Sequence, residues 1–533
     1  MRARSAIVAG TLAAFVTAAS PVFAQKSGGI LRVTHRDNPP SASIHEEATN
    51  STIMPFMAVF NNLVMFDPQE KRNSAEKIVP DLAESWSWNA DETRLTFKLR
   101  SGVKWHDGKP FTARDVKCTW DALTGKADEK SDLIRKNPRK IWYINLKDVT
   151  VDSDTQVTFE LGRPQPSFLS ILAAGYSPVY ACHANGRDMR SKPIGTGPFK
   201  VVEFKRNESI KLVRNPDYWN NGLPYLDAIE YRIVPNRSTR VLAFVAGDLD
   251  LTFDADITFP LLKDVKGQAP HAVCEARTTN VSSNLIVNRD APPFDNPKLR
   301  EALALALDRK PFSDILSQGN DVVGGPMLPP PSGVWGLPAD ELAKLPGYGP
   351  DIEKNRAEAR KIMEELGYSA AKPLMVKVST RNIAVYRDPA VILIDQLKTI
   401  HIDGELEAID TTVWHSKVTR KDYAIGLNLT GLGVDDPDVN FFENYHSKSE
   451  RNYTGYNNPK VEKLIEAQSA ERDRAKRLKI VGEIERMLIK DGARPIISHG
   501  AANTCWQPAV KGIVLQQNSI YNNWRFDTVW LDR

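Results

Sequence analysis

Hydrophobic residues recur at every second position in several short segments of the chain. The segment LTFKLR (95–100) alternates in this way, and QVTFEL (156–161) repeats the alternation. A period of two is typical of a β-strand with one buried face. The pattern predicts a small mixed unit of strands and helices over residues 75–190, with later strands in FKVVEF, SIKLVR and AIEYRIV.

Farther along the chain the hydrophobic spacing changes to three or four residues. DNPKLREALALALDR places leucines and alanines on one helical face, with Asn296 as N-cap and Pro297 at the first helical position. NRAEARKIMEELGY repeats the spacing and stops at Gly367. Strand patterns lie between these helices, so an α/β unit is expected over about residues 290–505. A helical run is also expected over TIMPFMAVFNNLVMF (52–66).

Composition narrows the class of protein. A chain of 533 residues is too long for one core and indicates two or three domains. Its net charge of +4, without a long basic run, argues against a nucleic-acid groove or a membrane-surface patch. The chain has no HExxH, G-x-S-x-G or Walker sequence, and its nine histidines are scattered. We therefore expect a protein that is not an enzyme and that has no metal site.

The first residues have the layout of a secretory signal peptide. Arg2 and Arg4 precede an apolar stretch at residues 6–19, and small or apolar residues lead to Ala24. Cleavage after Ala24 would release an exported protein. We therefore expect a periplasmic location.

The four cysteines are widely spaced and form no CxxC pair. They are Cys118, Cys182, Cys274 and Cys505. One or two disulfides would suit an oxidising compartment, and four cysteines allow three pairings. Buried free thiols are the alternative, and the sequence does not choose between them.

Two acidic clusters lie in AGDLDLTFDADITF (246–259) and LGVDDPDVNFFE (432–443). Solvated acids at turns are the favoured interpretation of the first cluster, and catalytic carboxylates are the alternative. The second cluster lacks the glycine and closing spacing of a calcium loop.

Six segments occur in a fixed order: PDLAESWSW, LTFKLRSGVKWHDGKPFTARDV, PIGTGPFKVVEF, LVRNPDYW, NPKLREALALALDR and YNNPKVEKLI. Together they resemble the family 5 extracellular solute-binding proteins, the dipeptide-, oligopeptide- and nickel-binding components of bacterial ABC importers. The resemblance implies an α/β, two-lobed periplasmic binding protein with an additional third domain, a hinge of two crossing strands and a ligand cleft between the lobes. The implied division is a signal peptide at 1–24, lobe I at 25–74, 193–288 and 507–533, an inserted extra domain at 75–192, and lobe II at 289–506.

The glycine pair in PIGTGPFKVVEF is then not expected to bind a phosphate. A dinucleotide-binding loop would need a third glycine and a following helix, whereas here Pro198 and a strand pattern follow. We expect this segment to bring the chain back from the extra domain into lobe I.

By the same resemblance, the chain captures a small ligand by lobe closure and delivers it to a membrane permease. The expected ligand is a peptide or a peptide-like acid, and the protein is expected to act as a monomer without a cofactor. An opine, a sugar or a metal complex is the alternative ligand, and a sensory receptor is an alternative role. A secreted hydrolase is the least favoured reading.

The resemblance also suggests ligand-binding residues. Peptide binders of the family hold the ligand's amino group with an aspartate, and the matching position here is Gly433, with Asp435 as the nearest substitute. Arg381 matches an arginine that binds the ligand's carboxylate, for which its planar fork is suited. An arginine without the amine-binding aspartate favours an acidic, non-peptide ligand. The other expected ligand-binding residues are Phe60, Asn61, Asn284, Tyr386, Trp414, Thr430 and Trp506.

Overall fold

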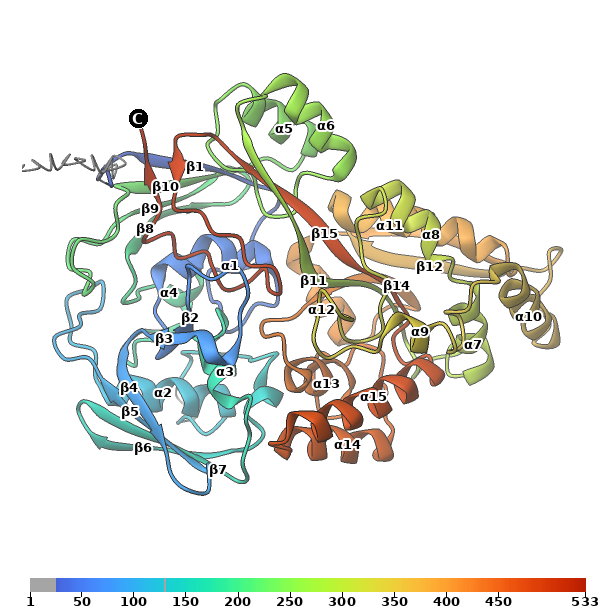
Figure 1. Ribbon diagram of the computed structural model, residues 1–533, viewed down its shortest axis with the longest axis horizontal. Helices are drawn as coiled ribbons and strands as arrows, with labels where there is room; N and C mark the ends of the chain where they lie inside the picture. Colours follow the sequence, from blue (N-terminus) through green and yellow to red (C-terminus); the bar gives the residue numbers. More distant parts are fainter. Residues whose placement is uncertain (1–24, 129–130) are drawn as a thin grey trace, which may run out of the picture.

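The computed structural model describes residues 25–128 and 131–533, and the signal peptide expected at residues 1–24 lies outside them. The chain forms two large halves that are joined by two long strands, β11 (Val273–Val287) and β15 (Ile496–Trp506) (Figure 1). Within the described residues, every helix is too short or too polar to span a lipid bilayer.

Lobe I is built around a four-stranded sheet in the order β1-β10-β9-β8. Its strands are β1 (Ile30–His35), β8 (Phe199–Lys205), β9 (Ser209–Arg214) and β10 (Ala228–Ile233). β1 and β10 run parallel, and the other pairs are antiparallel. β1 comes from the start of the described chain, whereas β8, β9 and β10 follow the extra domain in sequence. The sheet therefore combines segments from both sides of that domain.

The extra domain has its own antiparallel sheet in the order β4-β5-β7-β6. Its strands are β4 (Ala83–Trp88), β5 (Arg94–Leu99), β6 (Leu146–Ser153) and β7 (Gln156–Leu161). The two segments predicted from alternation are the central strands β5 and β7. A disulfide joins Cys118 on helix α2 (Ala113–Thr124) to Cys182.

Lobe II contains a mixed five-stranded sheet in the order β13-β12-β14-β11-β15. Besides β11 and β15, its strands are β12 (Leu374–Arg381), β13 (Ile402–Ile409) and β14 (Ile425–Gly431). β12 runs parallel to β13 and β14, as the alternation of strands and helices predicted. Two short antiparallel pairs complete the strands: β2 (Val64–Phe66) with β3 (Ile78–Pro80), and β16 (Val510–Lys511) with β17 (Trp530–Leu531).

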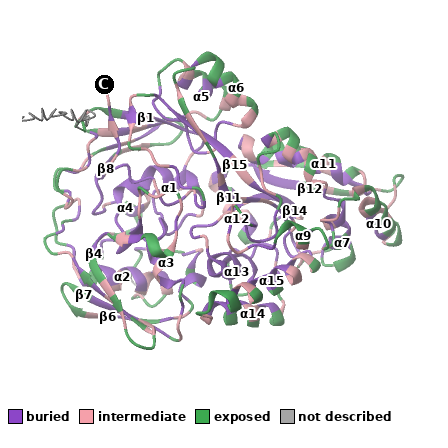
Figure 2. Cartoon of the chain, in the orientation of Figure 1, coloured by how far each residue is buried: buried purple, intermediate pink, exposed green. Residues whose placement is uncertain are grey.

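The helices are distributed around these sheets (Figure 1). Besides α2, those of the first half of the chain are α1 (Asn50–Phe56), α3 (Phe168–Ala173), α4 (Gly186–Ser191), α5 (Arg237–Val245) and α6 (Phe259–Gln268). Those of lobe II are α7 (Pro297–Ala306), α8 (Arg309–Phe312), α9 (Ala339–Leu342), α10 (Ile352–Glu365), α11 (Ala384–Lys398), α12 (Thr411–Thr419), α13 (Pro437–Tyr445), α14 (Pro459–Ala470) and α15 (Arg474–Lys490). Figure 2 shows α13 buried throughout, whereas α10 and α14 carry exposed faces.

β11 and β15 pair along two stretches that are separated by an irregularity. Residues 273–278 of β11 pair with residues 501–506, and the ladder resumes only at Ser282. Asn280 lies in the gap with φ of 51°, a left-handed conformation that asparagine tolerates. A disulfide between Cys274 and Cys505 joins the two strands on the lobe I side of this gap. The ladder therefore has a natural bending point between the lobes.

PIGTGPFKVVEF brings the chain into β8, as expected. A Cβ atom on Gly195 would lie 1.9 Å from the Val59 carbonyl oxygen, and one on Gly197 would lie 2.5 Å from the Val59 carbonyl carbon. The glycines are therefore needed because two backbone segments approach closely. Thr196 donates a hydrogen bond to Asn61 inside the same core.

The helix caps were predicted better than the lengths of the elements. Asn296 and Asn458 accept hydrogen bonds from the first turns of α7 and α14, each followed by proline. The helix expected over residues 52–66 is wrong in part, because α1 ends at Phe56 and β2 occupies the end of the range. The Asn62 backbone N–H donates to Asp81, and the Asn62 side chain donates to two distant carbonyls, so tertiary bonds override the local pattern.

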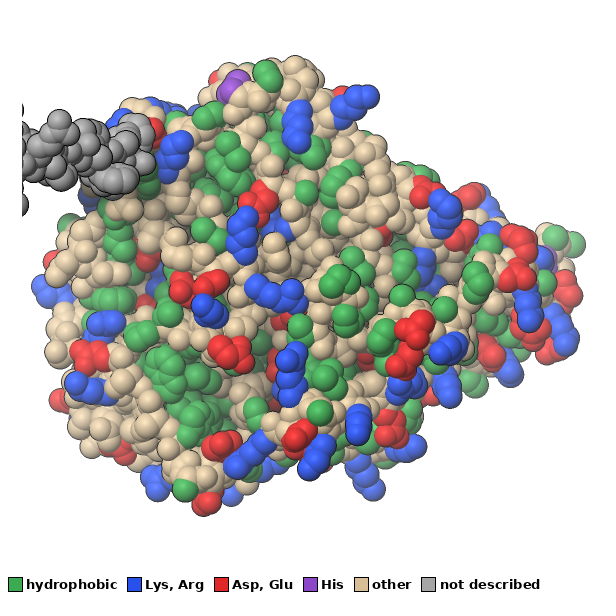
Figure 3. All heavy atoms as spheres, viewed as in Figure 1, with side chains coloured by type: hydrophobic (Ala, Val, Ile, Leu, Met, Phe, Trp, Pro, Cys, Tyr) green, Lys and Arg blue, Asp and Glu red, His purple; other side chains and the backbone are tan. Residues whose placement is uncertain are grey.

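The outer surface carries charges of both signs. On the face shown in Figure 3, lysine and arginine side chains are interspersed with aspartate and glutamate.

Candidate ligand-binding site

A cavity with a volume of about 180 Å³ lies between the two lobes. Lobe I contributes residues that follow β1 and residues of α5, and lobe II contributes residues of α11, α12 and β14. The bending point of β11 and β15 also forms part of the wall, through Thr279, Val281 and Gly500. The cavity therefore touches both lobes and the strands that connect them.

Arg381 is the centre of a buried cluster, named here the Arg381 cluster, that comprises Arg381, Asp37, Tyr386 and Thr411. Arg381 stands at the carboxyl end of β12, and its Nη2 lies 2.9 Å from Oδ2 of Asp37. Its guanidinium also donates to the hydroxyls of Tyr386 and Thr411, at 3.1 and 3.0 Å. Asp37 belongs to lobe I, so this ion pair joins the lobes across the cavity.

The electrostatics of the Arg381 cluster keep its acid ionised. Burial by itself would raise the pKa of Asp37, but the charges of Arg381, Arg36 and His35 lower it below its usual value. A second pair, Arg237 and Asp388, joins α5 to α11 at 3.2 Å. Both ion pairs form between lobe I and lobe II.

Of the ten expected ligand-binding residues, Arg381 and Tyr386 line the cavity. The other eight lie away from its wall: Phe60, Asn61, Asn284, Trp414, Thr430, Gly433, Asp435 and Trp506. A ligand role for each of the ten stays a prediction.

Phe60 and Asn61 are packed in the core of lobe I. The ring of Phe60 stacks on Tyr180 with centroids 5.1 Å apart, and the Asn61 amide donates to Asp81 at 2.8 Å. Trp414 is fully buried in a separate apolar cluster, and Trp506 ends β15 on the lobe I side of the hinge. These surroundings match a packing role.

Asn284 and Thr430 bond to each other on the neighbouring strands β11 and β14, at 3.0 Å. Their sequence neighbours Ser283 and Leu429 line the cavity instead. β11 and β14 thus both contribute to the cavity wall, and the ligand roles of Asn284 and Thr430 stay predictions.

Gly433 and Asp435 lie beside the extra domain and the C-terminal segment. A Cβ atom on Gly433 would lie 3.0 Å from the indole of Trp142. Asp435 accepts hydrogen bonds from Asn280 and Asn518, and burial raises its pKa. Asp435 is thus tied to the bending point of β11.

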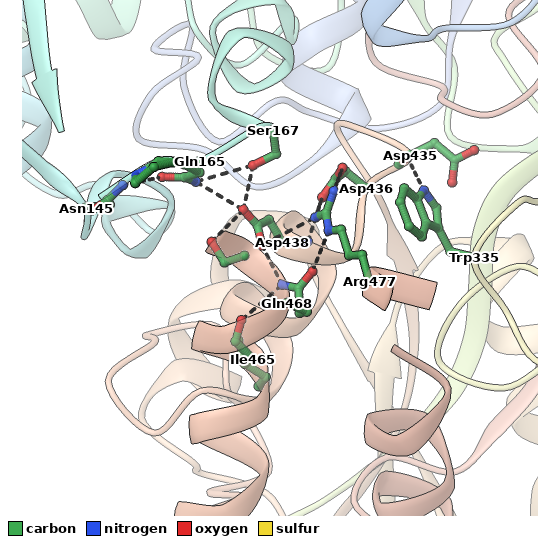
Figure 4. A network of polar contacts seen from close by, with 12 residues as sticks. Asn145, Gln165, Ser167, Trp335, Asp435, Asp436, Asp438, Ile465, Gln468 and Arg477 are labelled. Carbon is green, nitrogen blue, oxygen red and sulfur yellow. Dashed lines mark hydrogen bonds and ion pairs between the residues drawn. The ribbon is translucent and has the colours of Figure 1, made fainter. Parts of the chain in front are cut away.

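The next two aspartates form a network, named here the Asp438 network, that includes Asp436, Asp438, Arg477, Gln165, Ser167, Gln468 and Ser469 (Figure 4). Arg477 binds both oxygens of Asp436, at 2.9 and 2.5 Å. Asp438 accepts from Gln165 and Ser167 of the extra domain, at 3.2 and 2.5 Å. Asp436 also caps α13 by accepting from the Asp438 backbone N–H.

Sequence reasoning did not assign to the site seven other residues of the cavity wall that are charged or are histidine: Arg36, Arg237, Asp254, Asp321, Asp388, His415 and Arg451. Asp254 belongs to the first acidic cluster, and its interpretation as a solvated turn was wrong. It is 1% exposed and paired with Arg277, while the neighbouring Asp256 is paired with Arg240. Arg36 directly follows the buried strand β1, and position at the carboxyl end of a strand could have identified it.

Comparisons with known proteins agree with this architecture. The family model for the bacterial extracellular solute-binding proteins, family 5, matches residues 77–452. The chain belongs to this family. It is 27% identical over 465 residues to the periplasmic oligopeptide-binding protein OppA of Haemophilus influenzae, covering 83% of each chain.

Solved structures share the fold over nearly the whole chain. The binding protein DppA of Helicobacter pylori, in complex with the peptide STSA, has a TM-score of 0.83 at 22% identity, covering 95% of this chain and 99% of that one. The binding protein AgaA of A. tumefaciens R10, in complex with agropinic acid, has a TM-score of 0.81 at 20% identity with the same coverage. The α/β, two-lobed periplasmic binding protein fold expected from the sequence is thereby confirmed.

Proposed function

We propose that this chain captures a small acidic solute between its lobes in the periplasm and delivers it to the membrane permease of an ABC importer. The observation that carries the proposal is a cavity walled by both lobes, with Arg381 of lobe II bonded to Asp37 of lobe I. A solute that contacts both walls favours the closed form, so its binding free energy shifts the open–closed equilibrium. The solute itself is released unchanged, and one chain performs the cycle as a monomer.

A peptide or a peptide-like acid is the first candidate solute. OppA and DppA, to which the chain is similar, are named for oligopeptide binding and solved with a peptide, respectively. Within the site we assign solute contact to Arg381 and Tyr386, which line the cavity. A solute carboxylate at Arg381 would compete with Asp37 for the same guanidinium.

A non-peptide acid, such as an opine, is the second candidate. Gly433 stands where the resemblance expects the aspartate that binds a peptide's amino group. An ammonium group buried without a carboxylate would be costly. AgaA, which shares the fold, is solved with such an acid.

Mass spectrometry of the solute that co-purifies with the protein tests the proposal most directly. A thermal-shift panel of di- and tripeptides and small acids would follow. A solute at a hundredfold excess over its Kd should add about 2.7 kcal/mol of stability. If peptides give no shift and small acids do, the peptide candidate fails; if no solute of either kind is found, the binding function fails.

Delivery needs a separate measurement. The loaded protein should stimulate the ATPase of its importer in proteoliposomes, and the solute should be recovered unmodified. Conversion of the solute into another compound would contradict the proposal, and light scattering that gives two chains per particle would contradict the monomer.

A further inference from the structure

Two buried guanidinium groups, those of Arg36 and Arg381, lie near Asp37 at the lobe I side of the cavity; Asp256, a further electrostatic neighbour of Arg36, is already paired with Arg240. Asp37 lies 2.9 Å from Arg381, and it is also an electrostatic neighbour of Arg36. Burial and the charge of Arg381 lower the pKa of Arg36, while Asp37 opposes them. Arg36, Asp37 and Arg381 are 8, 9 and 1% exposed, so this group holds one uncompensated positive charge away from solvent.

A second group of two guanidiniums near one carboxylate lies between lobe II and the extra domain. Arg451 forms an ion pair with Glu443, and Arg139 lies within electrostatic reach of both. All three are buried. Glu47, whose carboxyl accepts from Ser41 and is faced by Lys136, is a further electrostatic neighbour of Arg139.

His415 lies between these two groups. It lines the cavity, and its charged neighbours are Arg381, Arg451, Lys136 and Arg139. Both of its ring nitrogens are buried and have no hydrogen-bond partner in the part of the chain that the structure describes. Burial and these cations lower its pKa well below the usual value, which leaves the ring neutral.

Several donors of these groups are left unused. Among the described residues, Nε of Arg36 and Nη1 of Arg451 are buried without an acceptor. Arg237 is paired with Asp388, and Asp254 is paired with Arg277. The half-buried Asp321 accepts from the hydroxyls of Ser313 and Ser317. Nε of Arg237 and Oδ2 of Asp254 are likewise buried without a hydrogen-bond partner among the described residues. Unused buried donors on guanidinium groups are costly, and an anion relieves the cost by accepting from them.

Taking the proposed function as given, we infer that the solute carries two anionic groups, one received by Arg36 of lobe I and the other by Arg451 and His415 of lobe II. Closure without an anion buries two uncompensated positive charges, and a solute with one charge neutralises half of them. A dianion restores neutrality at both ends, so it selects the closed form. Leu429, Ile497 and Phe312 line other parts of the cavity and suit an apolar spacer between the two acid groups.

The experiment uses the charge of the solute as its variable. A cell extract is separated by anion exchange, and each fraction is tested for thermal stabilisation of the full mature chain. Stabilising activity is expected in the fractions that elute with dicarboxylates. Activity confined to neutral or cationic fractions would overturn the inference and leave the binding function standing, whereas no activity in any fraction would overturn both.

Defined probes then measure the contribution of the second charge. Succinate, glutarate, adipate and pimelate are compared by calorimetry with their monoamides, and N-acetyl-L-alanyl-L-glutamate with its glutamine analogue. The best diacid should bind about ten- to hundredfold more tightly than its monoamide. Equal affinity for acid and amide throughout the series would contradict two anion receptors.

Variants locate the receptors. Arg36→Gln should weaken binding of the best diacid about ten- to hundredfold and should largely remove its advantage over the monoamide. Arg237→Gln is the matched control, because Arg237 also lines the cavity but its charge is met by Asp388. Arg36→Lys keeps the positive charge without the planar guanidinium, so it should lose less affinity for the diacid than Arg36→Gln. If Arg36→Gln folds and binds the diacid like the wild type, the assignment is wrong.

Discussion

The Arg381 cluster and the Asp438 network contain the same kinds of charged side chain, arginine and aspartate, in different proportions. In the Asp438 network, two carboxylates surround one guanidinium, and Gln165, Ser167 and Gln468 supply further donors to Asp438. In the Arg381 cluster one guanidinium is bonded to one carboxylate, a second guanidinium, that of Arg36, lies near the same carboxylate, and donors of the cavity wall remain unused. The first arrangement is complete as it stands, while the second is completed by an anion.

The two regions also differ in what they connect. The Asp438 network holds lobe II against the extra domain, and the Arg381 cluster holds lobe II against lobe I beside the cavity. Opening of the lobes must break both. The comparison assigns the Asp438 network to the stability of the closed form and the Arg381 cluster to the choice of solute.

The largest effect is expected from Arg477→Ala. This change leaves Asp436 and Asp438 buried without their cation, which should lower the free energy of unfolding by about 3–5 kcal/mol. Urea denaturation measures it, and Lys479→Ala, on the exposed face of the same helix, should change nothing. A loss below about 1 kcal/mol would place this pair among weak surface bridges.

Arg381→Ala should lower the free energy of unfolding less than Arg477→Ala does, but it should weaken solute binding more. Arg36 stays beside Asp37 and the cavity admits water, so the free energy of unfolding should fall by about 1.5–3 kcal/mol. Stabilisation by the best acidic solute should be lost in a thermal-shift assay. Arg387→Ala, exposed on α11, is the control. An unchanged solute-induced shift would remove Arg381 from the site.

Features that depend on local chemistry could be predicted from the sequence. Asparagine followed by proline identified the start of α7, because capping needs only adjacent residues. The family resemblance suggested Arg381, which stands at the end of β12 and lines the cavity.

Features that depend on distant partners could not be predicted. The sequence predicted that Asp254 and Asp256 are exposed to solvent, because burial of an acid is costly unless the acid is paired with a cation. Their partners Arg277 and Arg240 are 23 and 16 residues away in sequence, and only the folded chain brings each pair together. The disulfide pairing of Cys274 with Cys505 is likewise set by strand register across 231 residues.

A buried acid without a cation extends the comparison to a third case. Glu485 accepts from the backbone N–H groups of Met327 and Leu337 and forms no ion pair among the described residues. Burial raises its pKa from 4.5 to about 8. Between these values the folded chain holds a proton that the unfolded chain releases.

The free energy of unfolding should therefore fall as the pH rises from 4.5 to 8. Urea denaturation at several pH values measures the slope. Glu485→Gln keeps the shape, and the contribution of this site to the slope should disappear. A slope that persists unchanged in this variant would assign the pH dependence to other groups.

Tyr386→Phe should give the smallest effect and should separate positioning from solute contact. The change removes the hydroxyl that accepts from Arg381 at 3.1 Å but keeps the ring 4.8 Å from the guanidinium carbon. Arg381 keeps its bonds to Asp37 and Thr411, so loss of this one hydrogen bond should lower stability by about 0.5–1.5 kcal/mol and solute affinity by about two- to tenfold. If affinity instead falls as far as in Arg381→Ala while stability hardly changes, the hydroxyl itself binds the solute, and Tyr386 contributes to recognition directly rather than by orienting Arg381.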